Sequence, residues 1–311
     1  MTTIKHYLSL VKFSHTIFAL PFAMIGFFLG IAQLESLPFV KFSFEILDEP
    51  HEKLGVFFYH KWYVFVLVLV CMVTARSAAM AFNRYLDRSF DANNPRTAIR
   101  EIPAGIIGAS SALRFTIFNC LLFVAATYCI NTICFFLSPV ALFVILFYSF
   151  TKRFTALCHL VLGVGLSLAP IGAYLAVTGA FALLPILFSF AVLFWVSGFD
   201  IIFALQDEAF DRSQGLHSIP AALGTAKALR VSELLHLLSA ACVIGAGFYG
   251  QFGWLYWVGT LGFCSMLVYQ HSIVKPSDLS RVNIAFMTAN GIASVVFALF
   301  VIADIFVSHH S

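Results

Sequence analysis

The chain has 311 residues, of which 61% are hydrophobic and only 11% are charged. Because a soluble domain carries about 25% charged residues, this composition excludes a soluble globular protein. We expect a single integral membrane domain over residues 1–311, surrounded by the lipid bilayer. The formal net charge of +3 is small, and we expect no nucleic-acid partner.

The apolar runs are long and do not alternate with polar residues, so they predict helices rather than the strands of a barrel. A membrane-spanning helix needs about 20 apolar residues. We therefore expect an all-α integral membrane protein, a bundle of nine transmembrane helices. Its predicted spans are roughly 14–34, 62–86, 111–130, 133–150, 157–178, 182–205, 231–249, 252–272 and 283–307.

Lysine and arginine predict the orientation, because they are enriched in cytoplasmic loops. If the N-terminus is cytoplasmic, 14 of the 18 basic residues fall on the cytoplasmic side. Two long inner loops, roughly 88–110 and 208–230, then face the cytoplasm, and residues 35–61 form the long outer connection. We expect a multi-pass protein of the inner or plasma membrane with a cytoplasmic N-terminus and two cytoplasmic active-site loops. We expect this connection to be a solvated or interfacial loop, with a short surface helix as the alternative, and its role stays open.

Two acidic segments end even-numbered spans in this arrangement, so both face the cytoplasm. Within each segment the polar residues recur at helical spacing, which places them on one face of a helix. Each segment is followed by a polar loop with a prolyl turn, which makes a weak internal repeat. The members are Asn83, Asp87 and Asp91 in the first segment and Asp200, Asp207 and Asp211 in the second.

Carboxylates at a membrane boundary can simply be the polar ends of helices, which explains one or two of them. Five carboxylates on two faces, some flanked by arginine, favour a functional site, since ionisable groups in membrane segments are functional candidates. Magnesium is usually held by a few carboxylates together with phosphate oxygens. Arginine matches phosphate oxygens through its planar fork. The sequence therefore predicts a site for magnesium and a diphosphate.

The segment NRYLDRSFDANNPRTAIREIPAG resembles the first signature of the UbiA superfamily of intramembrane prenyltransferases, and DIIFALQDEAFD resembles the second. The resemblance covers nearly the whole chain. It implies Mg²⁺-dependent transfer of a polyprenyl group from a polyprenyl diphosphate to an acceptor, most often an aromatic ring. The donor ionises, the electron-rich ring attacks the allylic carbocation, and a proton is lost.

The resemblance also implies roles for individual residues. The metal ligands are Asn83 and the four catalytic aspartates Asp87, Asp91, Asp207 and Asp211. The diphosphate ligands are Arg88, Arg96, Arg100 and Lys152, and the segment YSFTKR contributes Tyr148 and Arg153 to the acceptor site. The sequence departs from the family pattern at Arg84, Glu101 and Phe203, where the family often has aspartate, proline and tyrosine.

Arg76 lies seven residues before Asn83, on the same helix face and about 10 Å deeper. A charge at that depth needs a partner or a polar cavity. Asp200 lies at a comparable depth on the sixth span and matches the leading aspartate of the second signature. Two interpretations stay open: an Arg76–Asp200 ion pair that joins two helices, or two residues of the acceptor site. In the second, Arg76 binds the acceptor's carboxylate, with Arg153 as its rival.

The acceptor itself is predicted less closely. A hydroxylated aromatic carboxylate of the 4-hydroxybenzoate type comes first, as a precursor of ubiquinone. The segments SHTIFALPFAMIGF and TARSAAMAFNRYLDR also resemble a subgroup associated with prenylation of 1,4-dihydroxy-6-naphthoate in menaquinone synthesis by the futalosine route. An ion-coupled transporter and a noncatalytic membrane scaffold are the alternatives from other classes. Prenyl chain length and oligomeric state stay open.

Overall fold

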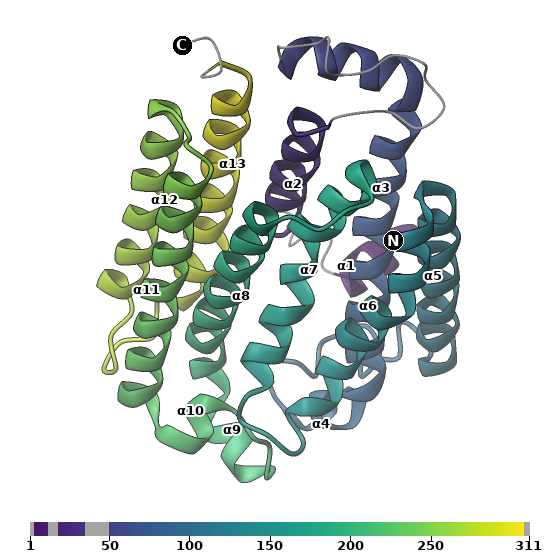
Figure 1. The fold of residues 1–311 in the computed structure, drawn as a ribbon. Helices are drawn as coiled ribbons and strands as arrows, with labels where there is room; N and C mark the ends of the chain where they lie inside the picture. The colour runs from purple at the N-terminus through teal and green to yellow at the C-terminus, as the bar shows by residue number, and fades with distance from the viewer. Residues whose placement is uncertain (1–2, 12–17, 35–49, 308–311) are drawn as a thin grey trace.

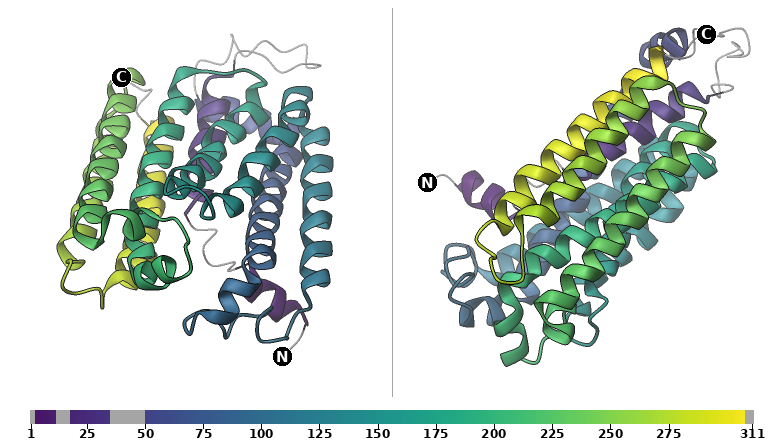
Figure 2. Two further views of the ribbon diagram at one scale, coloured as in Figure 1. Left: turned by 90° about the horizontal axis from the view of Figure 1, so that it is seen from below. Right: turned by 90° about the vertical axis from the view of Figure 1, so that its left-hand side faces the viewer.

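The computed structural model describes residues 3–11, 18–34 and 50–307. Its long elements are helices that stand side by side (Figure 1), and the right-hand view of Figure 2 shows them running along a common direction. The helices are α1 (Thr3–Leu10), α2 (Leu20–Ala32), α3 (Pro50–Leu86), α4 (Arg88–Asn93), α5 (Ala109–Ile130), α6 (Thr132–Thr151), α7 (Cys158–Thr178), α8 (Leu183–Ala204), α9 (Glu208–Ser213), α10 (Ile219–Leu223), α11 (Thr225–Tyr249), α12 (Trp254–Ile273) and α13 (Asn290–Val307). The all-α class predicted from the sequence is confirmed.

Seven helical segments of the described chain are long and apolar enough to span a membrane. The other two predicted spans correspond to α2 and α12. Helix α2 is apolar but has only 13 residues, and part of the predicted span before it lies in residues 12–17, outside the described chain. Helix α12 has 20 residues but includes Gln270 and His271. The count of nine therefore stays a prediction.

The expected outer connection is shorter in the structure than in the prediction. Residues 35–49 lie outside the described chain, but α3 begins at Pro50 and continues through a kink at Lys61, where the backbone leaves helical geometry (φ −134°, ψ 27°). Over residues 50–61 the expected loop was wrong, and the alternative of a helix in this connection is the one that the structure shows. The charged side chains that suggested a loop lie instead on the first turns of a long helix.

Both predicted inner loops contain short helices. Helix α4 follows the first acidic segment, and α9 and α10 follow the second. All three lie at the same end of the bundle, which is the lower end in Figure 1 and the end facing the viewer in the left-hand view of Figure 2. The fold therefore brings the two acidic segments to one end of the molecule.

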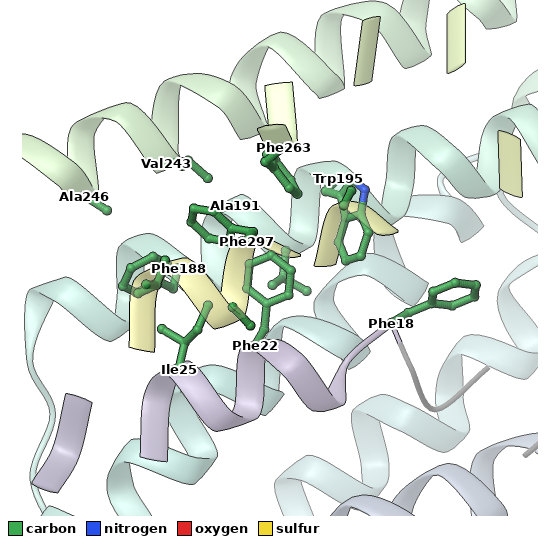
Figure 3. Packing of buried hydrophobic residues seen from close by; sticks show 14 of the residues in the cluster. Phe18, Phe22, Ile25, Phe188, Ala191, Trp195, Val243, Ala246, Phe263 and Phe297 are labelled. Carbon is green, nitrogen blue, oxygen red and sulfur yellow. The ribbon is translucent and has the colours of Figure 1, made fainter. Parts of the chain in front are cut away.

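Aromatic side chains fill the core between α2, α8, α12 and α13 (Figure 3). Phe22, Trp195, Phe263 and Phe297 are all fully buried, and the ring centroids of Phe22 and Trp195 are 5.3 Å apart. Such pairs stabilise a core beyond the apolar area that they bury. This core fixes α8, which carries the second acidic segment at its end.

A buried asparagine ties this core together. A π-helical turn, Ile284–Ala289, precedes α13, and Asn290 donates hydrogen bonds to the carbonyls of Ala285 and Phe286 at 3.2 and 2.9 Å. Its Oδ1 accepts from Trp195 Nε1 and from Gln270 Nε2, both at 2.8 Å. A π turn misaligns backbone groups, and lipid supplies no water to hydrogen-bond with them. The Asn290 side chain binds two carbonyls of the π turn and links that turn to α8 and α12.

Helices α7 and α8 pack closely at a glycine. A Cβ atom on Gly163 would lie 2.3 Å from Ser197 Oγ and 2.5 Å from the Leu193 carbonyl oxygen. Small residues allow membrane helices to approach each other in this way. The contact brings His159 of α7 beside Asp200 of α8.

We predict that Asn290→Leu lowers the free energy of unfolding by about 2 kcal/mol or more, because a buried polar group without a partner costs about 1–3 kcal/mol. Denaturant titration of the purified protein measures the loss. The matched control is Asn119→Leu, because the buried Asn119 amide donates only to Phe115 of its own helix at 2.8 Å. Equal losses in the two variants would contradict the role given to Asn290.

Candidate active site

The first acidic segment keeps helical spacing although a helix ends within it. Helix α3 ends at Leu86 and α4 begins at Arg88, with Asp87 between them. The Asp87 amide still donates to the Asn83 carbonyl at 2.9 Å, and the Asp91 amide donates to the Asp87 carbonyl at 2.7 Å. The three residues therefore share one face, as their four-residue spacing predicted.

In the second segment a 3₁₀ turn, Leu205–Asp207, separates α8 from α9. Asp207 ends this turn, and Asp211 lies within α9 and is fully buried. The guanidinium of Arg96, from the loop after α4, forms a forked ion pair with Asp207, in which Nε donates to Oδ1 at 2.9 Å and Nη2 donates to Oδ2. Asn94 Nδ2 also donates to Asp207 Oδ1, at 3.3 Å. The loop of the first motif thus contacts the acid of the second.

Each of the four predicted catalytic aspartates has a basic partner. Arg153 Nη2 lies 3.3 Å from Asp87 Oδ1, and Arg100 Nη1 lies 2.6 Å from Asp91 Oδ1. Such pairing is needed because carboxylates at the end of a hydrophobic bundle are costly unless neutralised. The remaining pairs are Arg96 with Asp207 and Lys152 with Asp211, the latter with Nζ 2.7 Å from Oδ1.

Three further contacts complete the cluster. Asn83 Nδ2 donates to Asp87 Oδ2 at 3.0 Å, and Ser218 Oγ donates to Asp211 Oδ2 at 2.9 Å. Buried Arg84 has Nη1 3.8 Å from Asp91 Oδ2. Where the family often has another aspartate, this chain therefore places a cation beside one of the acids.

Burial and neighbouring charges shift the pKa values of Asp87 and Lys152 in this cluster. Burial and then the nearby Asp91 raise the pKa of Asp87 above its ordinary value, although Arg153 and Lys152 oppose the shift. Burial lowers the pKa of Lys152, but Asp211 and then Asp207 outweigh it and raise the pKa above its ordinary value. Lys152 therefore stays protonated at neutral pH and retains its charge for an anionic ligand.

These residues fit magnesium that binds together with a diphosphate. Within the described ranges, no three histidine, cysteine, aspartate or glutamate side chains gather closely enough to hold a metal by themselves. Each motif instead offers two carboxylates, and Asp91 Oδ2 is buried without a hydrogen-bond partner. Because Mg²⁺ usually takes one or two carboxylates, with phosphate oxygens and waters as its other ligands, the donor set suits a shared site.

Arg88 lies apart from this cluster. Its side chain is exposed, with the guanidinium carbon 4.7 Å from the Tyr85 ring centroid and Nη1 donating to the Tyr85 carbonyl at 2.6 Å. The structure thus brings Arg96, Arg100 and Lys152 to the acids but leaves Arg88 outside them.

An apolar cavity of about 380 Å³ lies beside the cluster, lined mainly by α3, α5, α6 and α7. Its lining includes Met80, three residues before Asn83, and Tyr148, four residues before Lys152. Because four residues make about one helical turn, the cavity begins within a turn of the acidic cluster.

Arg76 also lines this cavity, and its buried Nε has no hydrogen-bond partner. The predicted Arg76–Asp200 ion pair is not formed, since Asp200 Oδ2 lies 2.7 Å from Nδ1 of His159. The close packing of α7 on α8 favours this nearer partner, while Arg76 on α3 faces the cavity. Sequence reasoning missed His159, although a lone histidine in an apolar run, six residues after Arg153, was a signal.

The UbiA prenyltransferase family model matches residues 56–292. The 4-hydroxybenzoate octaprenyltransferase of Nitrosomonas europaea is 31% identical over 235 residues, which cover 76% of this chain and 80% of that protein. The enzyme of the same name from Aeromonas salmonicida is 31% identical over 241 residues, covering 76% and 81%.

Solved structures share the fold. The apo UbiA homolog from Aeropyrum pernix K1 has a TM-score of 0.73 at 29% identity, covering 94% of this chain and 98% of that one. The UbiA homolog from Archaeoglobus fulgidus bound to GPP and Mg²⁺ has a TM-score of 0.69 at 19% identity, covering 96% and 99%. The protein is a multi-pass integral membrane protein, and it is a prenyltransferase that belongs to the UbiA family.

Proposed function

We propose that this prenyltransferase attaches a polyprenyl group from a polyprenyl diphosphate to a hydroxylated aromatic carboxylate of the 4-hydroxybenzoate type, giving a lipid quinone precursor. The observation that carries the proposal is the linkage of the two acidic motifs through basic side chains at one end of an apolar cavity. The names of the relatives from Nitrosomonas and Aeromonas support the acceptor class.

The diphosphate binds where the basic side chains now hold carboxylates. Arg96, Arg100 and Lys152 exchange their carboxylate partners for phosphate oxygens, which are equally suited to charge-assisted hydrogen bonds. Arg88 joins them only after turning away from the Tyr85 carbonyl. Mg²⁺, when bound, neutralises charge on the leaving pyrophosphate. Its ligands are Asn83, Asp87, Asp91, Asp207 and Asp211.

The prenyl chain occupies the apolar cavity. Its volume of about 380 Å³ falls within the range of about 300–1,000 Å³ that is usual for small-molecule sites. Burial of the prenyl chain in this cavity keeps its apolar surface away from the polar end of the bundle. The cavity also excludes water, which protects the allylic carbocation from hydrolysis. The reactive end of the donor then lies at the boundary between cavity and acids.

The acceptor binds at the same boundary. Arg76 has a buried, unpartnered Nε and takes the acceptor's carboxylate. Tyr148 lines the same cavity as Arg76. Asp200 lies beside His159 of α7, a helix that also contributes to the cavity lining. Arg153 pairs with Asp87, so it contributes at the outer edge of the acceptor site.

The same proposal includes the finer topology: one domain over residues 1–311, nine spans, and a cytoplasmic N-terminus and active-site end in the inner or plasma membrane. The surplus of basic residues in the segments of the active-site end supports this orientation. A transporter is disfavoured, because transporter sites lie near the membrane midplane whereas the paired aspartates lie at helix ends.

The direct test offers the purified protein one polyprenyl diphosphate with equal amounts of 4-hydroxybenzoate and 1,4-dihydroxy-6-naphthoate. We expect Mg²⁺-dependent release of pyrophosphate, and mass spectrometry should identify prenylated 4-hydroxybenzoate. A prenylated naphthoate would assign the alternative acceptor and reject the first. Absence of both products and of pyrophosphate would contradict prenyl transfer to an aromatic acceptor.

The metal site supplies the control for this assay. Asp211→Asn keeps the size of a buried side chain but removes a charged metal ligand, and we expect turnover to fall about 100-fold, as when one transition-state contact is lost. The matched control, Asp278→Asn, changes an exposed aspartate that accepts a hydrogen bond from the Ser280 amide at 2.9 Å. It should leave turnover unchanged.

Arg76→Leu separates acceptor binding from structure. Because Arg76 has no ion-pair partner among the described residues, its removal breaks no pair, and we expect an unchanged or higher Tm. The Michaelis constant for the acceptor should rise at least about tenfold, as when one hydrogen-bonded charge contact worth about 1.5–3 kcal/mol is lost. The constant for the donor should stay unchanged. A lower Tm with both Michaelis constants unaltered would show that the residue is structural.

A further inference from the structure

Three consecutive residues of the second inner loop hold Asp211 together with its basic partner. The amide of Leu216 donates to the Asp211 carbonyl at 2.8 Å, and the amide of His217 donates to the Lys152 carbonyl at 2.7 Å. The next residue is Ser218, whose Oγ donates to Asp211 Oδ2 at 2.9 Å. This short segment thus fixes the backbone of the acid and of the cation, and it also contacts the carboxylate itself.

The Ser218 hydroxyl is fixed in both directions. Its oxygen accepts a hydrogen bond from the Ala221 amide at 3.2 Å, as the N-cap of α10. A hydroxyl has one proton to donate, and Ser218 donates it to Asp211 Oδ2. Because Ser218 is fully buried, solvent does not compete for that proton. A neutral group therefore anchors one oxygen of the carboxylate.

The other oxygen of Asp211 is the one left for a metal. Among the described residues, Oδ1 is buried and receives no hydrogen bond, although Lys152 Nζ lies 2.7 Å from it. In the proposed function Lys152 turns to the diphosphate when the donor binds. A buried carboxylate that loses its cation is costly, so Asp211 then offers Oδ1 to Mg²⁺. Ser218 has no charge that a phosphate attracts, and it keeps Oδ2 in place during the exchange.

Asp211 depends on such an anchor more than the other three metal-site aspartates. Its side chain is fully buried, whereas those of Asp87, Asp91 and Asp207 are 27%, 9% and 13% exposed. Water can hydrogen-bond with a partly exposed carboxylate and help to orient it. For Asp211 that task falls to neighbouring protein groups, of which Ser218 is the neutral one.

We propose that Ser218 is a positioning residue for the metal site, and that it acts through Asp211 by holding Oδ2 so that Oδ1 binds Mg²⁺. This inference rests on the proposed function, in which Asp211 is a metal ligand. Groups that orient metal ligands change metal affinity by about 10–100-fold when they are removed. The effect of Ser218 should therefore appear as a changed requirement for Mg²⁺.

The competing explanation is that Ser218 serves only as the cap of α10. Loss of an N-cap lowers stability, and it acts on the fold whether or not a metal binds. The two roles use different parts of the hydroxyl, since the cap uses the oxygen and the contact with Asp211 uses the proton. An experiment on metal affinity, in the presence and absence of the Asp211 charge, therefore separates them.

The test measures the Mg²⁺ concentration at which binding of geranyl thiolodiphosphate, an unreactive donor analogue, is half-maximal. Isothermal titration calorimetry on the purified protein gives this value without any acceptor. In Ser218→Ala we expect the value to rise at least about tenfold. Ser218→Cys keeps the size of the side chain but has a weaker donor, so it should raise the value less. If Ser218→Ala does not fold, Ser218→Cys decides the question.

Ser239→Ala is the matched control. Ser239 is also fully buried, and its hydroxyl donates to the Ala191 carbonyl at 2.8 Å. Ala191 precedes Asp207 by 16 residues, which corresponds to about 24 Å along the helix. We expect Ser239→Ala to lower Tm, because it removes a buried hydrogen bond, and to leave the requirement for Mg²⁺ unchanged.

Ser218→Ala is also measured in the Asp211→Asn background. An amide is a poor ligand for Mg²⁺ and leaves the hydroxyl little to orient. If Ser218 acts through the carboxylate, its removal should therefore add almost no further loss of Mg²⁺ affinity in this background. If the cap of α10 is responsible, the loss should be the same in both backgrounds, because the energies of independent effects add.

Three results would overturn the inference. They are an unchanged requirement for Mg²⁺ in the Ser218 variants, an equal change in Ser239→Ala, and an equal further loss in the Asp211→Asn background. In each case the unmodified protein binds the analogue with Mg²⁺, so the proposed function stands. If the unmodified protein binds no analogue at any Mg²⁺ concentration, the proposed diphosphate site fails and the role of Ser218 fails with it.

Discussion

Charge neutralisation at the end of a hydrophobic bundle is the constraint on which the site depends. Four aspartates gather where apolar helices end, and carboxylates there are costly unless they are paired. Their cationic partners come from other segments of the chain, so charge pairing also joins those segments. The clearest case is the forked contact of Arg96 with Asp207, which links the loop after α4 to the end of α8. An arginine fork suits phosphate as well as carboxylate, so the same side chains can hold the fold and later the donor.

The deeper part of the site depends on helix packing rather than on charge. Close approach of α7 and α8 at Gly163 places a histidine beside Asp200. The aromatic core and the Asn290 network fix α8 from its other side. Rigid helices thus position the acids and the cavity, while short loops carry the cationic groups that must exchange partners when substrate binds. This division is typical of sites that combine a fixed scaffold with mobile loops.

Local features of this protein were predictable from sequence because they depend on spacing along one chain segment. The four-residue spacing of Asn83, Asp87 and Asp91 predicted one face, and backbone hydrogen bonds maintain it across the end of α3. Length and hydropathy likewise predicted the positions of most helices. Over residues 50–61 the expected loop was wrong and the alternative helix was right, because charged residues also occur on exposed helical turns.

Tertiary partners were harder to predict, because depth in the membrane says how far along a helix a residue lies but not which neighbour it faces. Arg76 and Asp200 have comparable depth, yet Asp200 pairs with His159 of α7 and Arg76 lines the cavity. The partners of individual aspartates, such as Lys152 for Asp211, depend on how the inner loops fold back. No periodicity in the sequence encodes those distances.

The central claim is that Arg96 and Asp207 bind each other without ligand and bind the ligand when it is present. A double-mutant cycle on Arg96→Gln and Asp207→Asn tests this claim most directly. The free energy of unfolding is measured for the unmodified protein, both single variants and the double variant. Without ligand we expect a coupling energy of about 1 kcal/mol or more between the two residues, as for a forked, partly buried pair. With Mg²⁺ and geranyl thiolodiphosphate the coupling should largely disappear, because each side chain turns to the ligand. Coupling that is absent without ligand, or unchanged with it, would contradict the account.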